Sequence, residues 1–167
     1  MNLEWLYRGS AVLAALCLVG IAVLIFAQII GRLFGVIIPS ADDFSGYLMA
    51  ASIFLALPDT FRSGGHIRVT MMIDRLPTTA RYWVEILCIA TGTLLTGYFA
   101  WYIVKMVWES YIFGEVSQGY VPISLWIPQT PLAFGLIVLL IAFLEELWRA
   151  IHGQPVRYDQ GQQDIGH

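Results

Sequence analysis

Long apolar stretches alternate with short polar ones along this chain, and two of the apolar stretches clearly predict helices. Residues 9–31 carry no charged side chain, and their only strongly polar one is Gln28. Residues 86–104 are also uncharged and lie between Glu85 and Lys105. Because roughly 20 apolar residues in a helix span the hydrocarbon core of a bilayer, both stretches predict membrane-spanning helices.

Two further apolar stretches are less regular. Residues 44–57 reach spanning length only if their helix continues through Pro58 and Asp59 to about Arg62. The charge-free run 116–144 has three prolines in its first half, so its regular helix is predicted to begin between residues 123 and 131. The pattern therefore predicts four spans, at about residues 9–34, 43–62, 82–108 and 123–149.

Composition supports a membrane protein. Hydrophobic residues make up 58% of the 167 positions and charged residues only 13%, whereas soluble domains are about half apolar and a quarter charged. We therefore expect an all-α integral membrane protein with one membrane domain over residues 1–152. Residues 153–167 are polar and predicted to be a disordered cytoplasmic tail. We find no internal repeat, no second domain and no basic face suited to nucleic acid.

The distribution of charge predicts the orientation. With four spans, nearly all of the basic residues fall on one side, and the other side receives acidic ones. The first group is Arg8, Arg62, Arg68, Arg75, Arg81, Arg149 and Arg157, and the second is Asp42, Asp43, Glu109 and Glu115. Since basic loops remain in the cytoplasm, both termini are predicted to be cytoplasmic. Aromatic residues would ring both interfaces, with Tyr7 and Trp148 inside and Trp108, Tyr120 and Trp126 outside.

Arg32 and the acidic pair Asp42 and Asp43 are candidate structural residues at the outer end of the first two helices. An arginine at this depth is costly unless it snorkels or pairs, and one of the aspartates is a nearby partner. Either aspartate can also cap the second helix. We expect a clamp within this helical hairpin, with a role in coupling or docking as the alternative.

The most charged stretch, residues 62–75, reads R-S-G-G-H-I-R-V-T-M-M-I-D-R. Gly64 and Gly65 predict a helix end, because glycine tolerates positive φ there. Apolar residues then alternate with charged ones up to Leu76, which predicts a short amphipathic segment lying in the inner interface. His66 and Arg68 are expected to anchor this cytoplasmic connection or to contact a partner. No lysine with Ser or Thr follows the glycines, so this is not a phosphate-binding loop.

No pattern indicates catalysis, cofactor binding or conduction. The histidines lie outside the spans without ligand spacing, and no acidic residue lies near the middle of a span. Lys105 and Glu109 can pair one helical turn apart. Cys17 and Cys88 lie in apolar runs and are interpreted as small hydrophobic residues. We therefore expect neither catalytic, substrate-binding nor metal-binding residues, and no cofactor in this chain.

Small residues at a spacing of four predict helix packing faces. Gly31 with Gly35 forms a GxxxG pair, and Gly46 with Ala50 has the same spacing. Such pairs allow the backbones of two helices to approach closely.

The block from Arg32 to Pro77 resembles a known family. It has an arginine ending the first helix, an acidic pair opening the second, then R-S-G-G-H-I-R-V and an apolar segment ending in Leu76-Pro77. This resembles the small membrane subunit, DctQ-like, of tripartite ATP-independent periplasmic (TRAP) transporters. The approach to the last helix, P-I-S-L-W-I-P, also fits. Thr70 departs from the pattern, since members often carry an acidic residue there.

The resemblance implies a non-catalytic scaffold in the bacterial inner membrane. Its partners would be a large membrane subunit, which carries the substrate and Na⁺ sites and moves as an elevator, and a periplasmic binding protein that delivers a carboxylate or sialic acid. The outer loops, residues 39–43 and 109–123, are the expected contacts with that binding protein.

Three other functions remain to be weighed. An autonomous small multidrug transporter needs a buried acidic residue in the first helix, and a haem-bearing anchor needs histidines within the spans. The sequence has neither. The remaining alternative is a membrane anchor or assembly subunit of another multi-subunit membrane complex.

Overall fold

The structure, a computed structural model, describes residues 4–62 and 78–152. Its helices are α1 (Glu4–Leu33), α2 (Ala41–Arg62), α4 (Thr78–Ile112) and α5 (Trp126–Ile151). All four are long and apolar enough to cross a membrane, which confirms the predicted all-α membrane fold. The predicted amphipathic segment after Arg62 and the polar tail from residue 153 lie outside the described residues.

The helices differ in extent from the predicted spans. Helix α4 has 35 residues and runs beyond the predicted span at both ends. Its apolar stretch lies in its middle, and polar residues extend the helix without interrupting it. Helix α5 begins at Trp126, within the predicted range of 123–131, and residues 116–125 before it form a hydrogen-bonded loop with an antiparallel bridge between Val116 and Ser124.

Helix α2 continues through Pro58, as the sequence predicted. A proline has no backbone N–H, so the carbonyl of residue i−4, here Phe54, loses its usual helical donor. That carbonyl lies against Gly135 of α5, so closely that a Cβ at this position would overlap it. The proline in α2 and the glycine in α5 thus belong to one close contact between the two helices.

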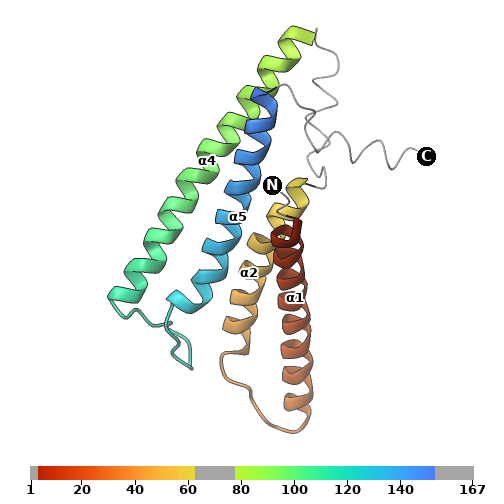
Figure 1. Cartoon of the computed structure of the whole chain (residues 1–167). Helices are drawn as coiled ribbons and strands as arrows, with labels where there is room; N and C mark the ends of the chain where they lie inside the picture. Colours follow the sequence, from red (N-terminus) through yellow and green to blue (C-terminus); the bar gives the residue numbers. More distant parts are fainter. Residues whose placement is uncertain (1–3, 63–77, 153–167) are drawn as a thin grey trace, which may run out of the picture.

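The four helices form a row. Figure 1 shows them side by side in the order α4, α5, α2, α1, so the chain builds two hairpins that meet through α2 and α5. Among the described residues, α1 touches α5 only marginally, and the row does not close into a bundle. We call the end with the first residues of α1 and the last of α5 the termini end. The opposite end, with residues 34–40 and 113–125, is the loop end.

Small residues and large side chains interlock along the row. The rings of Phe61 in α2 and Phe143 in α5 lie 4.1 Å apart, centre to centre. Phe143 also fills the space beside Gly92 of α4, and Leu140 packs on Gly97 one turn further along. In lipid no hydrophobic effect drives helices together, because lipid tails are as apolar as the side chains. Close packing of this kind is therefore a main source of attraction between the helices.

The predicted small-residue pairs do not pack helices against one another within the described residues. Gly31 and Gly35 instead form the end of α1: the Val36 N–H donates to the Gly31 carbonyl at 2.8 Å and the Gly35 N–H to the Arg32 carbonyl at 3.2 Å. With Gly35 at φ +72°, this is a Schellman motif, which requires a left-handed residue at that position. A Cβ at Gly46 would have nothing within 4 Å among the described residues.

Candidate functional site

The predicted clamp at the loop end has a different composition from the one expected. Asp42 accepts a hydrogen bond from the Gln28 amide at 3.2 Å, which ties α2 to α1. Arg32 is exposed, and within the described residues it forms no ion pair with Asp42 or Asp43. Gln28 lies one helical turn before Arg32 and is the side chain whose role the sequence analysis missed.

Ser40 joins the two loops at this end. It is the one described non-glycine residue with a positive φ, 57°, and its hydroxyl accepts a hydrogen bond from the Val121 N–H at 2.9 Å. Gly119 lies against the side chains of Ser40 and Asp43 so tightly that any Cβ there would overlap the Asp43 carboxylate. Asp43 therefore packs against the second loop, and the start of α2 is fixed relative to it.

The second loop has its own hydrogen bonds. Ser110 at the end of α4 donates to the Glu115 carboxylate at 2.7 Å, and the Ser117 N–H donates to the Ile123 carbonyl at 2.8 Å. The Leu125 N–H donates to the Glu115 carbonyl at 2.9 Å. This bonded loop presents Tyr120, which is 92% exposed, on its outside.

A second polar cluster, absent from the sequence analysis, lies at the termini end. Tyr7 of α1 is buried, its hydroxyl donates to Glu145 of α5 at 3.3 Å, and the Arg62 guanidinium of α2 lies 4.3 Å from its ring centre. Arg149 pairs with Glu145 at 3.5 Å. Side chains from three helices therefore meet here, and the sequence signal that could have indicated part of this cluster is the spacing of four between Glu145 and Arg149.

Two more polar groups lie in the same part of the molecule. Glu146 is only 3% exposed, although its neighbours in α5 are largely apolar. The Ser10 hydroxyl of α1 donates to the Leu55 carbonyl of α2. Since unpaired polar groups are costly inside a membrane protein, this cluster is a joint between helices that depends on its hydrogen bonds.

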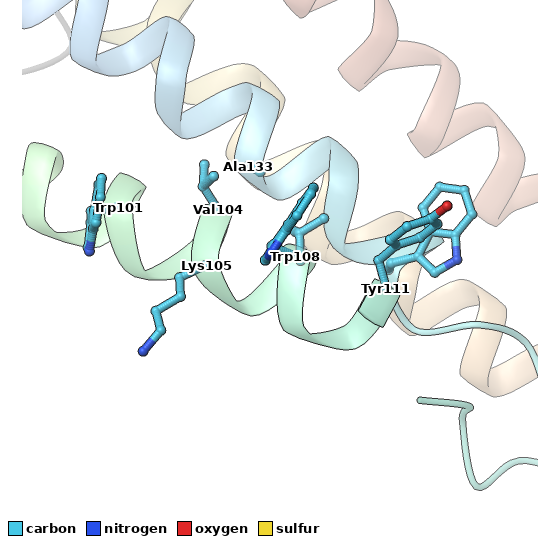
Figure 2. A pocket seen from close by; sticks show the side chains of 8 residues that line it. Trp101, Val104, Lys105, Trp108, Tyr111 and Ala133 are labelled. Atoms are coloured by element: carbon cyan, nitrogen blue, oxygen red, sulfur yellow. The ribbon is translucent and has the colours of Figure 1, made fainter. Parts of the chain in front are cut away.

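The faces of the row are apolar and uncovered. In α1, exposed residues recur every three or four positions and form one stripe along its length. They are Val12, Leu16, Val19, Val23, Phe26 and Ile30. On α4 and α5, tryptophan and tyrosine rings border a groove of about 420 Å³ (Figure 2). Lys105 lies at the edge of this groove, 3.4 Å from Glu109, as the one-turn spacing predicted.

The remaining predicted residues give less information. Arg62, at the end of α2, takes part in the cluster around Tyr7. Gly64, Gly65, His66 and Arg68 lie outside the described residues, so their predicted roles stay predictions. In the part of the chain that the structure describes, no group of three or more His, Cys, Asp or Glu residues is placed to hold a metal ion.

Four apolar helices in a row, with the two polar clusters described above near their ends, define a multi-pass membrane protein. The chain matches the family described as tripartite ATP-independent periplasmic transporters, DctQ component, over residues 21–153. It belongs to this family and is a small membrane component of a TRAP transporter. No curated protein matches the chain.

Proposed function

We propose that this chain is the non-catalytic small membrane subunit of a Na⁺-coupled TRAP transporter in a bacterial inner membrane. It would steady a large elevator subunit while that subunit imports a small organic acid such as a carboxylate or sialic acid. Na⁺ and substrate would bind to the large subunit, and a periplasmic binding protein would deliver the substrate. Family membership supports the transporter assignment.

The observation that best supports a scaffold role is the single-layer row of helices. A row exposes apolar surface on both faces, so it can contact a partner protein on one face and lipid on the other. The described polar side chains that bond between helices gather near the two ends, as Gln28 with Asp42 and Tyr7 with Glu145 illustrate. Such joints stiffen a wall, and between them the described helices carry no charged side chain of the kind that marks an ion or solute pathway.

Reconstitution tests this proposal. Proteoliposomes with the purified chain alone should show no Na⁺-driven uptake, and uptake should appear when the large subunit and the binding protein are both added. Uptake of solute by the chain alone would contradict a non-catalytic role. Full transport by the large subunit and the binding protein without this chain would contradict the scaffold.

Arg32 offers a second test, since it lies at the predicted outer face without an ion pair to Asp42 or Asp43. We expect Arg32→Ala to reduce co-purification with the large subunit while the variant alone melts at an unchanged temperature. Gln28→Ala is the matched control for a contact within the hairpin. Unchanged co-purification and transport in Arg32→Ala would remove this residue from the assembly surface.

A further inference from the structure

The groove between α4 and α5 crosses the boundary between hydrocarbon and headgroups. The uncharged stretch 86–104 has 19 residues, which in a helix extend about 28 Å. The hydrocarbon core is about 30 Å thick, so Lys105 falls where hydrocarbon ends at the loop end. Trp108 and Tyr111 then lie at headgroup depth, where amphipathic rings are favoured.

The walls of the groove are suited to an acyl chain. Toward the middle of the membrane the lining is Trp101, Val104 and Ala133, and toward the loop end it is Trp108, Tyr111 and Trp126. Figure 2 shows these side chains along α4 and α5, with the Lys105 amine at the edge and directed away from α5. The Tyr111 and Trp126 rings meet edge to face, 5.8 Å apart between centres, where the lining reaches the loop end.

The charges at the edge match a particular headgroup. The Lys105 amine and the Glu109 carboxylate are 3.4 Å apart, and their side chains are 57% and 50% exposed. An exposed pair of this kind contributes little by itself and is free to take other partners. Glu109 lies one turn further from the membrane centre than Lys105. A phosphate near Lys105 and an ammonium group near Glu109 would satisfy both in the order that a zwitterionic headgroup presents them.

We propose that this groove binds one phospholipid whose headgroup carries a phosphate and a primary ammonium group, as in phosphatidylethanolamine. Its acyl chain lies along Trp101 and Trp108, its phosphate accepts from Lys105, and its ammonium group donates to Glu109. A partner helix in the groove would cover the apolar walls equally well. An apolar helix would not, however, present an anion to Lys105 and a cation to Glu109, as this headgroup does. The inference requires only that the chain spans a membrane, and it is independent of the scaffold role.

Native mass spectrometry of the full chain in detergent, with equal amounts of phosphatidylethanolamine, phosphatidylcholine and phosphatidylglycerol, tests the headgroup. We expect a preference of about fivefold for phosphatidylethanolamine, the upper range for an exposed ion pair. Lys105→Gln should weaken binding of all three lipids. Glu109→Gln should shift the preference to phosphatidylglycerol, because Lys105 then keeps an anion without a competing carboxylate. Equal binding of the three lipids by the unmodified chain would overturn the proposal.

A tryptophan pair tests the place of binding. Trp108→Ala should reduce retention of phosphatidylethanolamine about tenfold, as expected for loss of a large apolar wall. Trp83→Ala is the control, since Trp83 is on the same helix and equally exposed but far from the groove. Equal effects of the two substitutions would contradict the site. Loss of the lipid on addition of the large subunit, with cross-links from Trp108→Cys to that subunit, would show that a protein occupies the groove instead.

Discussion

At the scale of single residues, Tyr7 connects more of the molecule than any sequence pattern indicated. The aromatic pattern placed it only at the inner interface. In the structure it is 1% exposed, its hydroxyl bonds to α5 and its ring receives Arg62 from α2. One side chain of α1 therefore contacts two other helices, including α5, which α1 otherwise touches only marginally.

Removal of the Tyr7 hydroxyl should weaken the fold. We expect Tyr7→Phe to lower the free energy of unfolding by about 1 kcal/mol, because Glu145 loses a donor while the ring and its contact with Arg62 remain. Thermal unfolding in a mild detergent measures the effect. Tyr98→Phe is the control, since Tyr98 is well exposed on α4. Equal melting temperatures for the two variants would show that the hydroxyl contributes nothing.

Ser40 is the corresponding residue at the loop end. Ser40→Ala removes the acceptor of the Val121 N–H and keeps a Cβ at positive φ, so we expect a loss of about 1–2 kcal/mol. Ser40→Gly also removes the acceptor but is free of strain at φ 57°, so it should lose less. Hydrogen exchange at the Val121 amide should quicken in both variants. An unchanged exchange rate would contradict the bond between the two loops.

At the scale of helices, the sequence predicted the existence of all four and missed the way in which they pack. Apolar run length and the charges beside each run are local properties, so they sufficed to predict α2 through Pro58. The contact surface of Gly135 depends on which helix lies beside it, and this information is not local. Gly31 and Gly35 show the converse, because the same spacing serves a helix end as well as a packing face.

The α2–α5 contact should be sensitive to a single methyl group. Gly135→Ala would drive a Cβ into the backbone at Phe54, and overpacking of this kind costs about 1–3 kcal/mol. Gly46→Ala is the matched control, because nothing lies near its Cβ and alanine favours a helix by up to about 1 kcal/mol. Opposite shifts in melting temperature are expected. A stabilising Gly135→Ala would contradict the close approach.

At the scale of the whole molecule, the row places residues 34–40 and 113–125 at one end and the start of α1 with the end of α5 at the other. The positive-inside rule predicts that the termini end faces the cytoplasm. The candidate site could be predicted only in part: Lys105 and Glu109 pair as their spacing indicates, whereas the Tyr7 cluster depends on three helices that are distant in sequence.

Cysteine labelling in intact cells tests this orientation. After replacement of Cys17 and Cys88 by alanine, Tyr120→Cys should react with a maleimide that cannot cross the inner membrane. His66→Cys and Arg157→Cys should react only after the cells are permeabilised. Reaction of His66→Cys in intact cells would reverse the orientation and would contradict the proposed arrangement of partners.

The single line along which α2 meets α5 has a mechanical consequence. The hairpin of α1 and α2 and the hairpin of α4 and α5 share little other contact in the described residues, so this line is the axis about which one hairpin would rotate against the other. A neighbouring protein that pushes on one hairpin would rotate it about the contact between Gly135 and Phe54. The hydrogen bonds of Tyr7 and Ser40, at the two ends of this contact, would limit the rotation. Resistance to such twisting therefore comes from these two joints and from the packed surface between them, which includes the Phe61 and Phe143 rings and the close approach at Gly135.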